Sequence, residues 1–476
     1  MEGQGRLGLV FFLSVFVLLF LSQCLNSAEE DESSLKLELI HRHAHPQLNS
    51  RLKTQLERVK ELHHNDMIRQ NMIVHKRRLT QTPPENRGTV RGDNAGIGMQ
   101  IYSASDFGLG QYFASFNVGT PSQKFTLVVD TGSDLTWMNC RYRCGERCRE
   151  NARINQRPVF RADLSSSFRP VPCLSRMCKV ELSNLFSLNA CPTPHTPCGF
   201  DFRYVDGSGA LGFFANETVS VDLTDGRMTT LHGVLVGCSD SFKGDNFDKG
   251  ADGVLGLANG KYSFTTKATQ YFGGKFSYCL VDHLSPKNVT NYLVFGSSKK
   301  ETSHMGRTRH TKLELNLIPP FYAVNVVGIS VGKIMVNVPV MAWDATQGGG
   351  MILDSGMSLT LLSKPAYMPV MFALEASLTK YERVKLDGVP MEYCFNSTGF
   401  DKTAVPKLVF HFVDGARFEP FVKSYIIDVA VGVKCLGIVS GIWPASSVIG
   451  NIMQQNHLWE FDLVGKKLGF TRSTCS

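Results

Sequence analysis

Long apolar runs are scarce in this chain of 476 residues. The run from Leu7 to Leu21 is 15 residues long, which is short for a helix that crosses a membrane. Arg6 precedes it, and the small pair Ser27 and Ala28 follows it, as in a cleavable secretory signal. We therefore predict a signal peptide over residues 1–28, with an uncleaved signal anchor as the alternative. No stable membrane span is expected after its removal.

Clustered positive charge is missing as well. The chain has 50 Lys and Arg against 42 Asp and Glu, a net charge of +8, but the basic residues are scattered along it. Nucleic-acid binding usually requires a basic patch or a stripe along one helix. We therefore expect no nucleic-acid partner. A basic protease associated with DNA is a weaker alternative, because it rests on net charge alone.

Cysteine is absent from residues 29–80, although the whole chain has 13. The same stretch holds six of the 13 histidines, and a Pro- and Gly-rich sequence at residues 82–98 follows it. Apolar residues recur within it at helical spacing, at Leu52, Leu56, Val59 and Leu62. We predict that residues 29–98 form a helical pro-segment and a cleavable linker. A plain disordered spacer is the alternative.

Cysteine is plentiful in the rest of the chain, where twelve remain once Cys24 leaves with the signal. In a secreted chain this even number predicts up to six disulfides. The run CRYRCGERC at residues 140–148 also allows a metal knuckle, but the secretory route favours disulfides, so no metal is expected. Sequons for N-glycosylation agree with that route, at Asn216, Asn288 and Asn396. The expected location is the secretory pathway, extracellular or vacuolar.

Short β-branched and aromatic runs fill the chain from residue 99 onward and indicate β structure. Two of them end in the same pattern, FTLVVDTGSDLTW at residues 125–137 and MILDSGMSLTLL at residues 351–362. Each is followed later by an apolar pair and a glycine, in GVLGLA at 253–258 and in SVIGNI at 447–452. This degenerate internal repeat predicts two similar lobes.

Asp130 and Asp354 each end an apolar strand, one in each repeat, and can meet where the lobes join. Two carboxylates about 3 Å apart share a proton and titrate as a coupled pair. The ionised member removes a proton from a water, which attacks a peptide carbonyl, while the protonated member donates to the carbonyl oxygen. This chemistry needs no cofactor, no metal and no covalent intermediate.

The neighbours of the two aspartates suit this chemistry. Gly132 and Gly356 allow close approach of the backbone and offer N–H donors. The hydroxyls of Thr131 and Ser355 can tie each loop to the other across the lobe boundary. Ser133 can donate to the outer oxygen of Asp130 and hold it ionised.

VVDTGSDLTW and ILDSGMSLT, with the two apolar-Gly elements, resemble the pepsin family of aspartic proteases over about residues 108–475. The Cys-rich first lobe is similar to the plant nepenthesin-type branch. The resemblance implies an all-β, bilobal fold with a substrate cleft between lobes at residues 99–300 and 301–476. It implies a monomeric acid endopeptidase, made as a zymogen, that acts on proteins or peptides. Similarity to a plant member associated with the chloroplast keeps a plastid destination open.

The resemblance also assigns roles to single residues. Asp130 and Asp354 match the catalytic pair. The segment RYVDGSGALG at residues 203–212 matches the flap hairpin that covers the substrate, and Trp137 matches the tryptophan that bonds the flap tyrosine. Within this hairpin we expect substrate contacts from Tyr204, Gly207 and Ser208. Ordinary hairpin packing is the alternative for Tyr204 and Trp137.

Met357 departs from the family pattern, which usually has Thr or Ser after Asp-Ser-Gly. That hydroxyl normally bonds the outer oxygen of the second aspartate, and Met cannot donate. We predict a raised pKa for Asp354, with a shifted acid optimum or reduced activity. The departure keeps open a second function, a catalytically weak or inactive binding protein, as in plant xylanase-inhibitor proteins of this fold.

Cysteine pairs are partly implied by the resemblance. The expected pairs are Cys173 with Cys178, Cys279 with Cys475, and Cys394 with Cys435. The other six cysteines allow 15 connectivities: Cys140, Cys144, Cys148, Cys191, Cys198 and Cys238.

The predicted pro-segment suggests its own mode of inhibition. Basic side chains of this arm would occupy the cleft and pair with the two aspartates. At acid pH the histidines gain charge and the aspartates lose it, so we expect the arm to be released.

Overall fold

The structure is a computed structural model of the full chain. It describes residues 34–41, 54–57, 59, 60, 63, 66, 67, 69–71, 73, 74, 112–142, 153–203 (without 155, 156, 186, 189 and 190), 209–243, 251–281, 291–296 and 307–475. Several predictions fall outside these residues and are not tested by it: the signal peptide, Tyr204, Gly207, Ser208, Asn288, Cys144 and Cys148.

β-strands make up most of the described chain. The strands of the first part are β1 (Leu35–His41), β2 (Tyr112–Val118), β3 (Gln123–Asp130), β4 (Thr136–Arg141), β5 (Arg153–Ile154), β6 (Arg157–Pro158), β7 (Phe160–Arg161), β8 (Arg169–Pro170), β9 (Gly199–Arg203), β10 (Gly209–Asp222), β11 (Met228–Lys243), β12 (Gly253–Gly256), β13 (Lys275–Cys279) and β14 (Asn291–Phe295). Those of the second part are β15 (Arg309–Lys312), β16 (Tyr322–Val324), β17 (Val326–Val331), β18 (Ile334–Met335), β19 (Met351–Leu353), β20 (Thr360–Ser363), β21 (Arg383–Val384), β22 (Cys394–Asn396), β23 (Leu408–Phe412), β24 (Arg417–Phe418), β25 (Ile426–Ala430), β26 (Val433–Leu436), β27 (Ile438–Gly441), β28 (Ser447–Ile449), β29 (His457–Asp462) and β30 (Lys467–Arg472).

Helices are few and short among the described residues. Beyond the N-terminal 74 residues, the described α-helices are α3 (Phe264–Phe272), α4 (Lys364–Glu375), α5 (Val422–Tyr425) and α6 (Asn451–Gln454). Single turns of 3-10 or π helix lie at Ala162–Leu164, Met177–Glu181, Ser183–Leu185, Val340–Ala342, Ala345–Gln347 and Lys402–Ala404. None of the described helices is long and apolar enough to cross a membrane. The all-β class predicted from the sequence is therefore confirmed.

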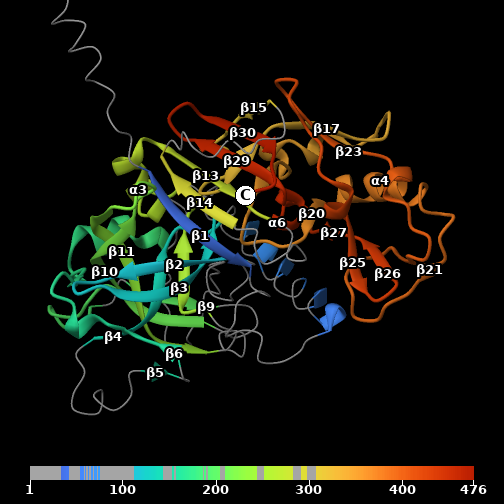
Figure 1. The fold of residues 1–476 in the computed structure, drawn as a ribbon. Coiled ribbons are helices and arrows are strands. Elements are labelled where there is room, and N and C mark those ends of the chain that lie inside the picture. The colour runs from blue at the N-terminus through green and yellow to red at the C-terminus, as the bar shows by residue number, and fades with distance from the viewer. Residues whose placement is uncertain are drawn as a thin grey trace, which may run out of the picture.

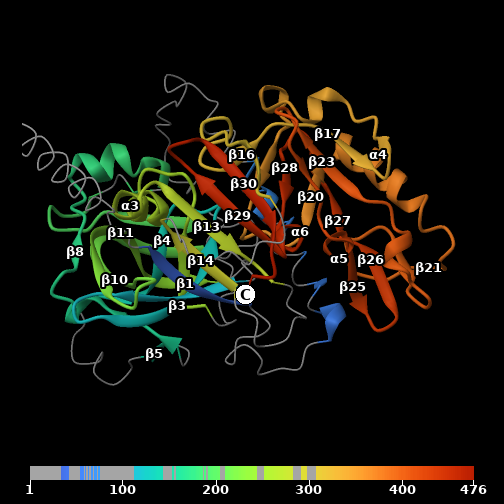
Figure 2. The same ribbon diagram turned by 45° about the horizontal axis from the view of Figure 1, so that its top comes forward.

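Two lobes lie side by side, the first drawn in cyan to yellow-green and the second in orange to red (Figures 1 and 2). A sheet of 15 described strands runs through the first lobe and continues into β29, β30 and β15 from the C-terminal part. β29 pairs with β13, so the end of the chain returns to the middle of the molecule. Three smaller sheets, of five, four and four described strands, build the second lobe. The bilobal arrangement expected from the repeat is confirmed.

The internal repeat appears as two matching sets of strands. In the first lobe β3 runs parallel to β12, which is antiparallel to β4. In the second lobe β19 runs parallel to β28, which is antiparallel to β20. Asp130 ends β3 and Asp354 directly follows β19. The two aspartates therefore occupy equivalent places at the end of an apolar strand.

The N-terminal arm (the described residues between 34 and 74) adds β1 to the large sheet. β1 lies between β14 and β2 and is antiparallel to both (Figure 1). Leu35, Leu37 and Leu39 are buried while Lys36 and Glu38 are exposed, which is the alternation of a strand with one face on the core. The sequence predicted only a helical arm here, so this strand is a new element. The second described stretch of the arm is helical, as predicted.

Five disulfides join described cysteines, which is consistent with the secretory route. Cys279 is bonded to Cys475 and Cys394 to Cys435, as expected. A further bond joins Cys140 of β4 to Cys238 of the parallel neighbour β11.

The expected pair of Cys173 with Cys178 is wrong. Cys173 is bonded to Cys191 and Cys178 to Cys198, with Cα separations of 5.8 Å and 5.6 Å. The reason lies in the backbone, because the segment before Cys173 pairs with the segment before Cys198 through the bridge Pro172 to Pro197. The bridge holds the stretch that contains Cys173 and Cys178 against the stretch that contains Cys191 and Cys198, and both disulfides join one stretch to the other.

Candidate active site

The two aspartates are held by equivalent backbone contacts. The Gly132 N–H donates to Asp130 Oδ1 at 2.8 Å, and the Gly356 N–H donates to Asp354 Oδ1 at 2.9 Å. Each donor lies two residues after its aspartate and is fixed by a tight turn. Both carboxylates are fully buried, so these N–H groups replace part of the water that each has lost.

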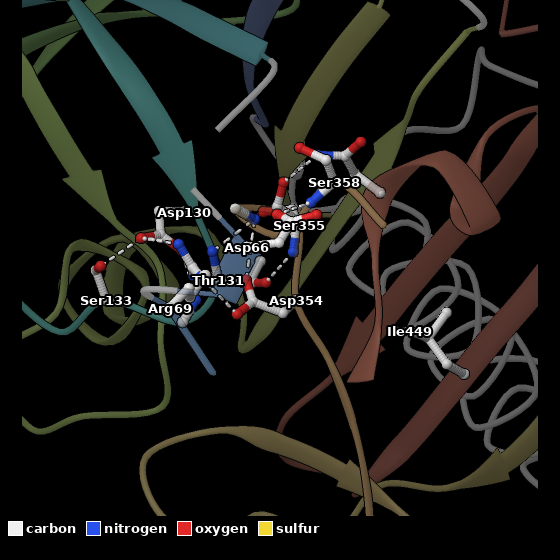
Figure 3. A network of polar contacts seen from close by, with 12 residues as sticks. Asp66, Arg69, Asp130, Thr131, Ser133, Asp354, Ser355, Ser358 and Ile449 are labelled. Atoms are coloured by element: carbon white, nitrogen blue, oxygen red, sulfur yellow. Dashed lines mark hydrogen bonds and ion pairs between the residues drawn. The ribbon is translucent and has the colours of Figure 1, made fainter. Parts of the chain in front are cut away.

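The two aspartate loops, residues 130–133 and 354–357, are bonded to each other across the lobe boundary. The Thr131 N–H donates to Ser355 Oγ at 3.1 Å, and the Ser355 N–H donates to Thr131 Oγ1 at 2.9 Å (Figure 3). Ser355 Oγ also donates to the carbonyl of Val129 at 3.2 Å. This reciprocal pair, which the sequence analysis anticipated, fixes the position of one loop relative to the other.

Glycine is required at the third position of each loop because the opposite carboxylate is so close. A Cβ on Gly132 would lie 2.8 Å from Asp354 Oδ2, and a Cβ on Gly356 would lie 2.5 Å from Asp130 Oδ1. The structure therefore brings Asp130 and Asp354 together, with each carboxylate against the loop of the other lobe.

The two aspartate loops differ in their fourth residue, which is Ser133 in the first loop and Met357 in the second. Ser133 Oγ donates to Asp130 Oδ2, whereas the equivalent Met357 is buried in the apolar cluster that also contains Leu359. Asp130 thus has two donors from its own loop and Asp354 has one among the described contacts. The missing hydroxyl expected from the sequence is therefore a real asymmetry of the site.

Arg69 of the N-terminal arm lies between the two carboxylates (Figure 3). Its Nη1 and Nη2 donate to the two oxygens of Asp130, the first at 3.0 Å. Its Nε and Nη2 donate to the two oxygens of Asp354, at 2.5 Å and 2.6 Å. One fully buried guanidinium therefore forms a two-pronged contact with each aspartate, the geometry in which arginine pairs best with carboxylates.

The pKa values of the two aspartates are shifted in opposite directions. Burial favours the neutral form of Asp130, but Arg69, Ser133 and the Gly132 N–H together hold its pKa below the usual value. Burial raises the pKa of Asp354, and the nearby charge of Asp130 adds to this while Arg69 opposes it. Burial also works against charge on Arg69, yet the two carboxylates keep its pKa above the ordinary value. Asp130 is the more stable anion of the pair.

A second residue of the arm, Asp66, bonds the second lobe. Asp66 Oδ1 accepts the Ser358 N–H at 2.7 Å, and Asp66 Oδ2 accepts the Leu359 N–H at 2.6 Å. The side chain is completely buried, and burial raises its pKa to about 8, against the effect of these two N–H groups and of Arg69. Asp66 and Arg69 therefore enter the site together.

Other residues of the arm fix it to the second lobe. Gln70 is buried and its Oε1 accepts the Ile442 N–H at 3.2 Å. Val59 and Ile73 are buried within the same apolar cluster as Met357. The arm is thus held by apolar packing as well as by charge.

The remaining predicted residue, Trp137, lies on β4, buried in an apolar cluster with Leu135 and Phe200. Its expected partner Tyr204 is outside the described residues, so that contact stays a prediction. Sequence reasoning anticipated a basic residue of the arm between the aspartates but did not identify Arg69, and it missed Asp66 and Gln70. The available signal was the cluster of these polar residues beside the apolar Ile73 in an otherwise helical pattern.

Metal binding has no evident site in the described part of the chain. No group of three or more His, Cys, Asp or Glu side chains there is placed to hold an ion. The polar network at the lobe boundary consists of carboxylates, hydroxyls, backbone N–H groups and one arginine (Figure 3).

Two family models match this chain. A family model described as "Xylanase inhibitor N-terminal" matches residues 112–297, and one described as "Xylanase inhibitor C-terminal" matches residues 321–472. The matches divide the chain between β14 and β16, as the internal repeat does.

Two plant relatives are similar over most of the chain. Aspartyl protease family protein 2 of Arabidopsis thaliana is 32% identical over 385 residues, which cover 80% of this chain and 74% of that protein. Aspartic proteinase nepenthesin-1 of Nepenthes gracilis is 29% identical over 387 residues, which cover 80% of this chain and 81% of that protein.

Solved structures share the fold. Basic 7S globulin from soybean superposes with a TM-score of 0.60 at 21% identity, covering 78% of this chain and 93% of that chain. Conglutin gamma from lupine seeds superposes with a TM-score of 0.59 at 19% identity, covering 77% and 93%. At this identity the likeness concerns the fold alone.

Proposed function

Because this chain belongs to the plant pepsin-like aspartic protease family, we propose that it is an endopeptidase that hydrolyses peptide bonds of proteins at acid pH. Asp130 and Asp354 are the catalytic pair. The observation that carries the proposal is that one guanidinium reaches both carboxylates, which places them close enough to act on one water.

The unequal number of donors in the two loops indicates which aspartate acts as the base and which as the acid. Once Arg69 leaves, Asp130 keeps the donors Ser133 and Gly132 and stays ionised, so it removes the proton from the attacking water. Asp354 keeps only the Gly356 N–H and holds the proton, which it donates to the carbonyl oxygen of the scissile bond. Thr131 and Ser355 keep the two loops in register during this exchange.

The N-terminal arm acts as a pro-segment, and the chain is made as a zymogen. Arg69 occupies the space between the carboxylates that the water needs, and it neutralises the anion that acts as base. Val59 and Ile73 add apolar burial, which contributes about 1.5–3 kcal/mol for each side chain. Residues 29–98 are the proposed extent of this pro-segment and its linker, and the protein acts in the secretory pathway.

Acid activation and proteolysis test the proposal together. The purified full chain is incubated at about pH 3–6 with a denatured protein, and cleavage is compared with that of Asp130→Asn and Asp354→Asn. We expect cleavage by the wild type and a loss of at least about 1,000-fold in each variant, because each removes one of two obligatory groups. Variant cleavage at the wild-type rate would overturn the proposal.

Two observations favour a second candidate function. The matching family models carry the name of xylanase inhibitors, and Met357 weakens the second aspartate loop. If the activated wild type cleaves nothing and instead binds and inhibits a xylanase, the chain is a binding protein on a protease fold. Cleavage that a general aspartic-protease inhibitor abolishes excludes this alternative.

A further inference from the structure

Asp66 marks a pair of hydrogen-bond donors that the catalytic proposal does not use. The backbone N–H groups of Ser358 and Leu359 are consecutive, and each donates to a different oxygen of the Asp66 carboxyl. They begin four residues after Asp354, on the segment that connects the second aspartate loop to β20. The pair therefore borders the catalytic site on the side of the second lobe.

The backbone around these donors is fixed by contacts independent of the arm. The carbonyl of Met357 accepts the Asn451 N–H at 2.7 Å, and the carbonyl of Ser358 accepts the Ile452 N–H at 3.1 Å. Asn451 Nδ2 also donates to the carbonyl of Ser355 at 2.9 Å. α6 thus holds the segment in place, so the two N–H groups keep their direction when the arm leaves.

The chemistry of the ligand follows from the two donors. Both oxygens of a carboxyl group can accept, because even the neutral acid retains an acceptor lone pair on its hydroxyl oxygen. An amide side chain of the same shape offers one acceptor, and its NH₂ group faces the second donor without bonding it. Two adjacent N–H groups in a buried setting therefore select Asp over Asn and Glu over Gln.

We propose that the Ser358 and Leu359 N–H groups form a carboxyl-binding subsite, which Asp66 fills in the precursor and an Asp or Glu side chain of the substrate fills in the active enzyme. The substrate half of this inference rests on the proposed endopeptidase function. The precursor half does not, because it concerns only the docking of the arm.

Spacing defines where the acidic residue lies in a substrate. Asp66 and Arg69 are helical and three residues apart, which is about 4.5 Å along a helix axis. An extended substrate covers about 3.3 Å per residue. The acidic side chain is therefore within about three residues of the scissile bond, which occupies the place of the Arg69 guanidinium.

The substrate half is tested by cleavage mapping. The acid-activated full chain digests a synthetic peptide library, and the residues around each cleaved bond are identified by mass spectrometry. We expect Asp and Glu to exceed Asn and Gln at one position within three residues of the bond. A matched Asp/Asn peptide pair at that position should differ about tenfold in kcat/KM, mainly through KM. Equal cleavage of the pair overturns the proposal.

The precursor half is tested without any catalysis. Hydrogen exchange of the full-length precursor at neutral pH reports on the 358–359 amides and on the arm. Asp66→Asn should raise exchange at both about tenfold, whereas the matched change Glu38→Gln, at an exposed arm residue on β1, should leave exchange unchanged. Equal behaviour of the two variants overturns the subsite. If the chain cleaves nothing but Asp66→Asn alone loosens the arm, the protease proposal fails and the carboxyl subsite stands.

Discussion

The two aspartate loops share a backbone plan and differ in the side chains that act on the carboxylates. Each follows an apolar strand, each has an N–H donor two residues after the aspartate, and each bonds the other through a hydroxyl. Ser133 adds a donor in the first loop, while Met357 adds an apolar side chain in the second. The two loops therefore have the same backbone geometry, while their carboxylates, Asp130 and Asp354, differ in proton affinity.

The helical part of the N-terminal arm, which follows β1, contacts the two lobes unequally as well. Arg69 bonds both aspartates, but Asp66 and Gln70 bond only the second lobe. Val59 and Ile73 also belong to an apolar cluster built from the second lobe. The loop with the fewer internal donors is thus the one that the arm covers more completely, which makes the contribution of each arm residue separable by mutation.

Replacing Arg69 should have the largest effect on this comparison. Arg69→Gln removes a positive charge that bonds both loops, and breaking a buried ion pair on one side costs about 3–5 kcal/mol. We expect the arm to dock at least about 100-fold more weakly, so the full-length precursor should cleave a peptide substrate without prior processing. The measurement is the activity of unprocessed precursor at mildly acid pH.

A matched control comes from the same arm. Lys60 lies against Gly388, away from both aspartates, so Lys60→Gln removes one positive charge without touching the pair. It should leave the precursor latent. A latent Arg69→Gln precursor would show that the remaining contacts of the arm, apolar and polar, close the site without this charge.

The pH dependence of arm release should have the next largest effect, and it distinguishes the contribution of Arg69 from that of Asp66. Arg69 helps to hold the pKa of Asp130 below its usual value while it is docked, so this contribution is lost as Asp130 takes up a proton on acidification. Asp66 behaves in the opposite way. Its pKa rises from 3.8 to about 8 on docking, so its contribution is complete below 3.8 and is lost as the pH rises through about 8.

The charged groups that face Asp66 are Arg69 and Asp354. We therefore expect the arm to dock most tightly at mildly acid pH, to loosen progressively as the pH rises toward about 8, and to leave in stronger acid. Hydrogen exchange of the arm between pH 3 and about pH 9 measures this. Asp66→Asn should abolish the alkaline change by itself, and an unchanged alkaline limb would contradict the assignment.

Exchanging the fourth residues of the loops should give a smaller effect of predictable sign. Met357→Thr supplies Asp354 with a donor, lowers its pKa, and should move the alkaline limb of the pH–rate profile down by about one unit. Ser133→Ala removes a donor from Asp130, raises its pKa, and should move the acid limb up by a similar amount. The profiles are recorded as kcat/KM after activation.

The double variant Ser133→Ala, Met357→Thr sharpens this test. It moves the hydroxyl donor from the Asp130 loop to the Asp354 loop. The acid and alkaline limbs of the pH–rate profile should therefore move toward each other, and the pH range of activity should narrow. Limbs that remain at their wild-type positions in both single variants would show that burial, and not the fourth residue, sets the two pKa values.

Much of this site could be read from the sequence because its signals are local. An apolar strand that ends in Asp, Thr or Ser, and Gly, repeated in each half, specified both the fold and the meeting of Asp130 and Asp354. Arg69 could not be selected, because helical periodicity gives the buried face of an arm but not the partner that faces it. The bonds of Cys173 and Cys178 were likewise decided by the pairing of distant backbone segments. β1 was missed because three alternating leucines are a short signal.

The cross-lobe hydroxyls should show the smallest effect, and they test whether the loops are equivalent as supports. Thr131→Val leaves the Ser355 N–H without its acceptor, whereas Ser355→Ala removes both the acceptor of the Thr131 N–H and the bond to Val129. Each orphaned, buried N–H costs about 1–3 kcal/mol. We expect Tm to fall by about 2–4 °C in each variant, with Ser355→Ala the lower because it loses two bonds. Differential scanning calorimetry of the full chain measures this, and equal Tm values for both variants and the wild type would show that the arm, not the hydroxyl pair, holds the lobes in register.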